Sequence, residues 1–180
     1  MPVDEMTRRN LELVESMRGR DISGTLLGVL DRTITPMGAR LLRHWILAPL
    51  IDRSAIDHRL DAVAVLASDL IARQALRDAL DGVRDVERLA GKAPAGRATP
   101  RELGALGASL GRLPAVEAAV RRVGSRGMLA DVLAKWDGCT DLAADVARTL
   151  VDRPPAIIGD GPARGAGAGN GAPAVDQHAS

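Results

Sequence analysis

Apolar side chains recur at intervals of three and four positions along most of the chain, with charged side chains in between. Over residues 36–48 this spacing places an apolar stripe on one side of a helix, with Arg40, Arg43 and His44 on the other side. The stripe consists of Met37, Leu41, Leu42, Trp45 and Ile46. The same pattern predicts helices over 24–31, 54–67, 69–80, 85–93, 99–113, 114–123, 127–137 and 140–152. The chain is therefore predicted to be all-α, a multi-helix bundle or arm.

Two Thr-Pro pairs mark helix starts with particular clarity. Thr35-Pro36 and Thr99-Pro100 each supply an N-cap hydroxyl followed by Pro at the first helical position, where the missing N–H would be unpaired in any case. Glu102 lies three residues after Thr99, so the second pair is predicted to form a capping box. Gly38, in the first turn after Thr35, is expected to let another helix approach closely.

Polar residues are also predicted to cap three of the following helices. Ser54, with Asp57 three residues further on, is expected to cap the helix over 54–67. Asp69 and Asp85 are expected to cap the next two helices. The side chains of the first of these helices that are predicted to face the core are Ile56, Leu60, Val63 and Ala67.

The segment before residue 24 has a weaker pattern. Leu11 and Leu13 alternate with Asn10 and Glu12, which favours a short extended segment. A ragged helix is the alternative for the same residues.

The composition changes beyond Pro154, where Ala, Gly and Pro dominate. Such a segment buries too little apolar surface to offset the entropy of ordering it. The sequence therefore predicts one folded domain over residues 1–158 and a disordered Ala/Gly/Pro-rich tail over residues 159–180.

Composition and charge exclude several classes of protein. Hydrophobic residues make up 46% of the chain, yet two Trp are the only aromatic side chains, which suits closely packed helices better than aromatic-rich strands. The net charge of +1 gives the molecule no strong field toward nucleic acid or membranes. No stretch approaches the roughly 18 apolar residues of a membrane span. The single cysteine, Cys139, cannot form an internal disulfide, so a cytoplasmic protein without membrane association is expected.

The sequence offers no phosphate-binding loop. Neither Lys92 nor Lys135 is followed by Ser or Thr, as the G-K-[ST] loop requires. Residues 167–172 read GAGNGA and fit a loose dinucleotide pattern, but that pattern needs a strand before it and a helix after it. Here Gly and Ala precede the segment and Pro173 follows it, so no cofactor-binding residue is predicted.

Candidate nucleophiles and metal ligands are isolated. His44, His58 and His178 lie in separate segments, without the convergent spacing that a metal requires. Cys139 precedes a predicted helix, where a thiolate could be stabilised, but a half-buried inert cysteine is the favoured alternative. We therefore predict no catalytic residue and no metal ligand, and the chain is not expected to be an enzyme.

A basic surface is the remaining candidate site. Four arginines lie on two neighbouring predicted helices: Arg40, Arg43, Arg53 and Arg59. Three acidic residues interleave with them: Asp52, Asp57 and Asp61. This mixture favours an ordinary solvated helix surface over a nucleic-acid site, and nucleic-acid-binding residues stay unassigned.

Two motifs near the N-terminus carry a family resemblance. Residues 7–13 read TRRNLEL, and residues 25–50 read TLLGVLDRTITPMGARLLRHWILAPL. Both are similar to the start of the core domain of the MutS family of DNA mismatch repair ATPases. The family pattern there is approximately T-x-R-N-L-E-L, followed by T-L-L-x-[VL]-L-[DN]-x-T-x-T-x-M-G-x-R-L-L.

Later segments resemble the same family. Residues 82–88, GVRDVER, are similar to G-x-x-D-[LI]-E-R, through Gly82, Asp85, Glu87 and Arg88. Residues 97–103, RATPREL, resemble R-A-x-P-R-[DE]-L, and LVDRPPA at 150–156 resembles [IL]-x-D-x-P-P. The resemblance covers about residues 4–158.

The resemblance implies a mechanical role. In the family, the helix that follows Thr35 belongs to a lever arm that links the DNA-binding clamp to the ATPase, which implies packing roles for Gly38 and Trp45. It also implies DNA as the partner of the whole family protein, and ATP with magnesium as its cofactors. The 180 residues contain no Phe for the family's mismatch wedge and no phosphate loop, so the resemblance implies a core domain without catalysis of its own.

The resemblance leads to expectations about completeness and association. After Pro154-Pro155 the family continues with G-G-x-I-x-x-G, whereas this chain reads GDGPARGAGAG, so we expect a truncated family member whose tail follows a shifted reading frame.

Missing later helices would uncover apolar side chains, and we expect self-association, a MutS-like partner or marginal stability. The side chains concerned are Leu41, Leu42, Leu103, Leu106, Leu110 and Val146. A stand-alone helical interaction module, possibly pairing with full-length MutS, and a nucleic-acid-binding helical domain are the alternatives.

Overall fold

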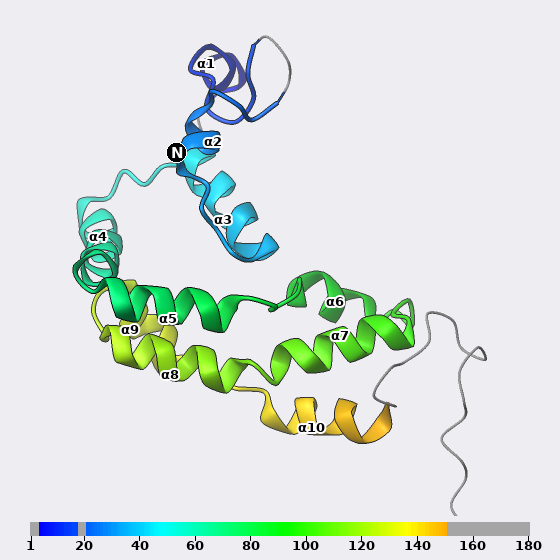
Figure 1. Ribbon diagram of the computed structural model, residues 1–180. Coiled ribbons are helices and arrows are strands. Elements are labelled where there is room, and N and C mark those ends of the chain that lie inside the picture. Colours follow the sequence, from blue (N-terminus) through cyan, green and yellow to red (C-terminus); the bar gives the residue numbers. More distant parts are fainter. Residues whose placement is uncertain (1–3, 18–20, 151–180) are drawn as a thin grey trace, which may run out of the picture.

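Every regular element in the part of the chain that the computed structural model describes, residues 4–17 and 21–150, is a helix (Figure 1). The helices are α1 (Glu5–Asn10), α2 (Leu26–Leu30), α3 (Pro36–Leu47), α4 (Arg53–Ser68), α5 (Leu70–Leu80), α6 (Val86–Lys92), α7 (Pro100–Leu110), α8 (Leu113–Val123), α9 (Met128–Ala134) and α10 (Thr140–Thr149). The prediction of an all-α protein is confirmed. The predicted tail over 159–180 lies outside the described residues and stays a prediction.

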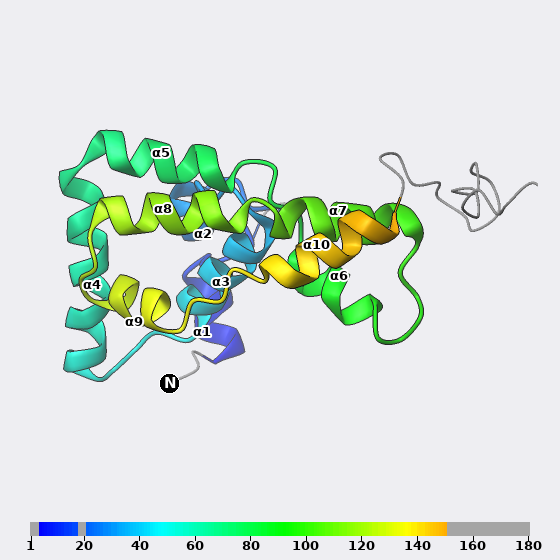
Figure 2. The same cartoon turned by 90° about the horizontal axis from the view of Figure 1, so that it is seen from below.

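Helices α4–α10 form an elongated unit, which we call the arm. α5 and α6 follow one another along one layer, and α7 and α8 run back along a second layer, with α8 against α5 and α7 against α6 (Figure 1). Figure 2 shows α4 crossing one end of the arm beside α9, while α10 lies against α7 toward the other end. Helices α1–α3 rise from one side of the arm, and we call them the N-terminal column (Figure 1).

The core of the arm is built from small and branched aliphatic side chains. Val83, Val116 and Val120 form its buried centre, and partly buried side chains from α3, α5 and α9 pack around them. Leu106 and Leu110 are also buried, at 5% and 4% exposed. The expectation that these two leucines lack covering is therefore wrong, because α6 and α10 both pack against α7.

The two Thr-Pro helix starts are confirmed. The Thr35 hydroxyl accepts a hydrogen bond from the Gly38 N–H (3.1 Å), and the Thr99 hydroxyl accepts one from the Glu102 N–H (3.2 Å). The close helix approach expected at Gly38 is wrong, because the three atoms nearest to a Cβ there belong to the side chains of Thr33 and Thr35, which precede α3.

Helix α4 differs from the prediction in both its cap and its inner face. Asp52 is the N-cap, and its carboxylate accepts a hydrogen bond from the Ala55 N–H (2.8 Å), so Ser54 lies inside the first turn. Ala62 is the buried residue of α4, whereas Leu60 and Val63 are 55% and 54% exposed. Packing against α5 and α9 selects the face that carries Ala62, and three residues of the predicted apolar stripe, Leu60, Val63 and Ala67, are exposed, whereas Ile56 is half-buried.

The segment before α2 is neither a continuous strand nor a long helix. α1 ends at Asn10, and Glu12 follows with a positive φ of 47°. The Leu13 carbonyl then accepts a hydrogen bond from the Leu27 N–H (2.9 Å), and Val14 is buried. Together with the hydrogen bond from the Leu26 N–H to the Glu12 carbonyl (3.3 Å), this bond ties the segment to the start of α2, where a short extended segment was predicted.

Candidate functional site

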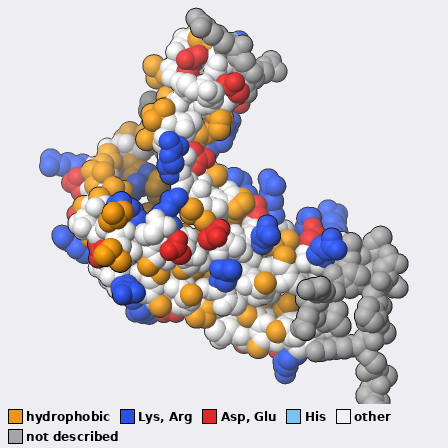
Figure 3. Space-filling view, in the orientation of Figure 1, with side chains coloured by type: hydrophobic (Ala, Val, Ile, Leu, Met, Phe, Trp, Pro, Cys, Tyr) orange, Lys and Arg blue, Asp and Glu red, His pale blue; other side chains and the backbone are white. Residues whose placement is uncertain are grey.

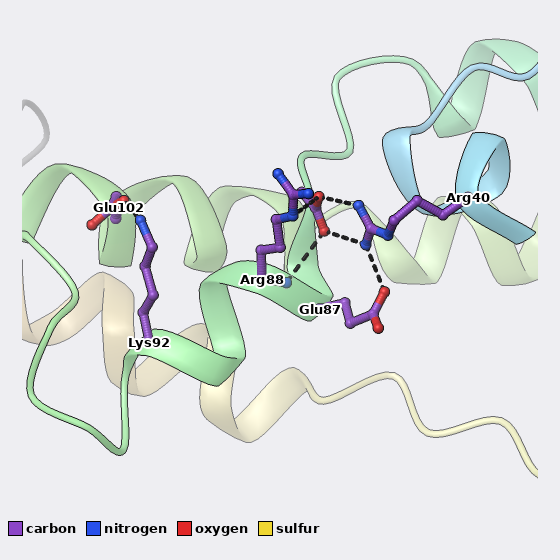
Figure 4. Close-up of polar contacts among 6 residues, drawn as sticks. Arg40, Glu87, Arg88, Lys92 and Glu102 are labelled. Atoms are coloured by element: carbon purple, nitrogen blue, oxygen red, sulfur yellow. Dashed lines mark hydrogen bonds and ion pairs between the residues drawn. The ribbon is translucent and has the colours of Figure 1, made fainter. Parts of the chain in front are cut away.

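The polar contact that joins the N-terminal column to the arm is centred on Arg40. From α3, its guanidinium reaches the two carboxylates at the start of α6 (Figure 4). Nη1 lies 2.5 Å and Nη2 2.9 Å from the two oxygens of Asp85, which is a bidentate pair. Nη2 also donates to Glu87 (2.6 Å). We call Arg40, Asp85 and Glu87 the ion-pair joint.

Asp85 is the central acceptor of the joint. Its carboxylate is the N-cap of α6, accepting a hydrogen bond from the Arg88 N–H (3.2 Å), and its side chain is 16% exposed. Hydrogen bonding from Arg40 is the main cause that lowers the pKa of Asp85 from 3.8 to about 2. The same carboxylates raise the pKa of Arg40, so the pair is fully charged at neutral pH.

Three other contacts support the joint. Met37 packs against the core cluster of the arm. Arg77 of α5 donates to the backbone carbonyl of Arg32 (2.8 Å). The Arg59 guanidinium lies over the Trp45 ring, 3.6 Å from its centroid, which is a cation–π contact between α4 and α3. No α3 residue is fully buried, so polar and cation–π contacts join the column to the arm alongside the packing of Met37.

A second ion pair closes the loop between α6 and α7. Lys92 at the end of α6 lies 2.5 Å from Glu102, which also accepts the Thr99 N–H (2.9 Å) and so completes the predicted capping box (Figure 4). Hydrogen bonding from Lys92 is the main cause that lowers the pKa of Glu102. The carboxylate therefore fixes both sides of the turn that carries the chain from α6 into α7.

The residues weighed for chemistry are not brought together. His58 pairs with Asp131 (2.8 Å), and His44 lies exposed on α3. Within residues 4–17 and 21–150, no group of three potential metal ligands occurs. Burial, then the nearby Asp137 and Asp141, raises the pKa of the Cys139 thiol, which disfavours a reactive thiolate. The GAGNGA segment and His178 lie outside the described residues.

The predicted basic surface consists of residues with partners. Arg40 belongs to the joint, Arg43 pairs with Glu15 (3.3 Å), and Arg53 pairs with Asp57 (3.5 Å). Arg59 lies on Trp45. The interpretation of these four arginines as ordinary mixed-charge surface agrees with this arrangement, and they form no separate basic patch.

Sequence reasoning placed Arg40 on the outer side of its helix and did not anticipate its partners. Arg40 and Asp85 are 45 residues apart, and no local spacing rule links them. The one available signal was that each belongs to a motif of the same resemblance, at 35–42 and at 82–88.

No helix in the described ranges has both the length and the apolar character needed to cross a membrane.

Comparisons with known proteins agree with the motif resemblance. The family model for MutS domain III matches residues 6–164. The DNA mismatch repair protein MutS of Halothermothrix orenii is 40% identical over 161 residues, which cover 89% of this chain and 18% of that protein. The MutS proteins of Alkaliphilus oremlandii (41% identical, 89% and 18% covered) and of Parasynechococcus marenigrum (42% identical, 88% and 18% covered) match similarly. This chain thus spans less than a fifth of the length of these relatives, and the match places it in the MutS family, as a protein that carries MutS domain III.

Proposed function

We propose that this chain acts as the structural core, or lever, of a MutS-type DNA mismatch repair system and has no catalytic activity of its own. The observation that carries the proposal is the ion-pair joint. It connects the two most distinctive motif segments, one in the N-terminal column and one in the arm, through Arg40 and Asp85. A bidentate Arg–carboxylate pair fixes relative orientation as well as distance, which is what a lever that transmits movement requires.

The proposal includes the absence of ATP hydrolysis and of a bound cofactor. Support comes from the 180 residues themselves, where neither lysine precedes Ser or Thr, so no loop of the G-K-[ST] type exists. The test is phosphate release from ATP and magnesium by the purified chain. We expect background release only. Release above background that a substitution in this chain abolishes would contradict the proposal.

We propose only weak binding of DNA, without preference for a mismatched over a fully paired duplex. The net charge is +1, the sequence contains no Phe, and the arginines at 40, 43 and 53 are already paired with carboxylates. A gel-shift comparison of the two duplexes at about 0.15 M salt tests this, because screening at that ionic strength resembles physiological conditions. A clear mismatch preference would contradict it.

A stand-alone helical interaction module is the second candidate. Large apolar side chains on α4 and α5 that lie in solvent favour it, among them Leu60, Leu70 and Ile71, at 55%, 64% and 80% exposed. A stable complex of the chain with a full-length MutS in sedimentation experiments would support this candidate over the lever alone.

A further inference from the structure

The underside of the arm contains a groove that the proposed lever role does not use. It lies between α7 and α10 and has a volume of about 710 Å³. Small residues of both helices line it, including Gly104, Ala108, Ala143 and Ala147. At Gly107 the two helices touch so closely that a Cβ would lie 2.5 Å from Cγ1 of Val146. The groove is therefore lined mostly by small residues, with Val146 and Leu150 as the larger aliphatic side chains beside them.

Three arginines border this groove, and among the described residues no acidic side chain lines it. Arg84 and Arg101 are exposed, and their side chains form no hydrogen bond or ion pair within the described part of the chain. Arg112 donates one N–H to the backbone carbonyl of Asp81 (2.6 Å). The groove thus combines an apolar floor with a positively charged border, unlike the mixed-charge surface of α3 and α4.

Buried contacts position two of these arginines. The backbone N–H of Arg84 donates to the hydroxyl of Ser109, which is fully buried and in turn donates to the Ala105 carbonyl (3.0 and 2.7 Å). Gly82 has a φ of +81°, and a Cβ there would lie 3.0 Å from the guanidinium carbon of Arg112. The loop between α5 and α6 therefore holds both arginines at the mouth of the groove.

A surface of opposite character lies at the other end of the arm, on α4. Leu60 and Val63 are 55% and 54% exposed, and exposed Asp57 and Asp61 border them on the same side of the helix. Figure 2 shows no other helix on this outer side of α4, and hydrophobic side chains gather at this end of the arm in Figure 3. We call this surface the outer face of α4. Arg53 pairs with Asp57 on this face at 3.5 Å. The loop before α9 lies beside Asp61, where a Cβ at Gly127 would be 2.8 Å from the Cβ of Asp61.

We propose that the outer face of α4 in one copy of this chain docks into the α7–α10 groove of a second copy. Leu60 and Val63 would rest on the Gly and Ala residues of the floor, beside Val146 and Leu150. The carboxylates of Asp57 and Asp61 would meet Arg84 and Arg101, whose planar guanidinium groups suit carboxylates. The groove and the outer face of α4 lie at different ends of the arm. Each contact between two copies therefore leaves the groove of one copy and the outer face of α4 of the other unoccupied, and the assembly grows head to tail.

The test is the sedimentation of the full 180-residue chain over a range of concentrations. The range extends to about 1 mM, because the weakest specific complexes have dissociation constants of that size. We expect the mean mass to rise with concentration beyond the dimer. The groove variant Arg84→Glu/Arg101→Glu and the face variant Asp57→Arg/Asp61→Arg should each associate at least roughly tenfold more weakly, because like charges then meet. Circular dichroism confirms that each variant folds, and all four positions are exposed. The control Arg9→Glu/Arg32→Glu changes the net charge by the same amount as the groove variant, at exposed positions in the N-terminal column.

Mixing the two variants gives the decisive result. On mixing, the intact α4 face of the groove variant meets the intact groove of the face variant, and the two altered surfaces also carry opposite charges. We therefore expect the mixture to regain the association that each variant alone has lost. If the wild-type chain stays monomeric, the proposal is wrong, and the groove is then a candidate site for an acidic segment of a different protein. Equal weakening in the control, or no regained association on mixing, also overturns it.

Discussion

The carboxylate of Asp85 serves two structural elements at once. It caps α6 by accepting the Arg88 N–H, and it receives both guanidinium nitrogens of Arg40 from α3. Asparagine is as good an N-cap as aspartate but carries no charge. The substitution Asp85→Asn therefore separates the two roles, because it keeps the cap and removes the ion pair.

The pH dependence of stability should report on that ion pair. Because Arg40 lowers the pKa of Asp85 from 3.8 to about 2, the folded state binds this proton less tightly than the unfolded chain. The stabilisation is complete above about pH 4 and is lost as the pH falls through about 2. The free energy of unfolding of wild type should exceed that of Asp85→Asn by a constant amount above pH 4, and the difference should shrink toward pH 2. A difference that stays constant down to pH 2 would show that the carboxylate contributes no charge-dependent stability.

The capping box at Thr99 makes a second prediction at the residue scale. Thr99→Ala removes the hydroxyl that accepts the Glu102 N–H at the start of α7. Losing an N-cap typically costs about 1 kcal/mol, so urea unfolding should show a decrease in the free energy of unfolding of that size. Thr99→Ser retains the hydroxyl and should lie close to wild type. Equal stability of the alanine and serine variants would mean that the turn does not depend on this cap.

At the scale of helices, Gly107 permits the contact between α7 and α10. A Cβ at this position would lie 2.5 Å from Cγ1 and 3.1 Å from Cβ of Val146, a β-branched side chain that adapts poorly. Gly91, inside α6, is the matched control, because a Cβ there meets nothing within 4 Å. Gly91→Ala should stabilise the chain by up to about 1 kcal/mol through helix propensity. Gly107→Ala should be about 1–3 kcal/mol less stable than Gly91→Ala in urea unfolding, because overpacking opposes the same propensity gain. Indistinguishable variants would show that α10 adjusts freely on α7.

The helices could be predicted where their signals are local. The hydroxyls of Thr35 and Thr99 act within three residues, so sequence spacing was enough to place α3 and α7. Ser54 was predicted in place of Asp52 because both residues are good caps, and only the fold decides between them.

Contacts between distant segments could not be predicted in the same way. The apolar spacing of α4 allows more than one inner face, and packing with α5 and α9 buried Ala62 while leaving Leu60 in solvent. The partners of Arg40 are 45 residues away, beyond any spacing rule. The family resemblance identified the residues of the joint but not their contact.

At the scale of the whole molecule, the N-terminal column is held to the arm by few contacts. These are the ion-pair joint, the Trp45–Arg59 contact, the Arg77 hydrogen bond and the packing of Met37. In the proposed lever role the column and the arm keep a fixed orientation, and Arg40 makes three of the hydrogen bonds that join them. Loss of Arg40 should therefore free the column while the helices of the arm stay folded.

The most direct measurement is the distance distribution between the column and the arm, by electron–electron double resonance. Spin labels at His44→Cys on α3 and Ala118→Cys on α8, in a Cys139→Ser background, use positions that are exposed. We expect one narrow distance in the otherwise wild-type chain, a broad distribution after Arg40→Ala, and unchanged helical content by circular dichroism. A broad distribution before the substitution, or a narrow one that persists after it, would contradict the claim that the ion-pair joint makes the column and the arm one rigid unit.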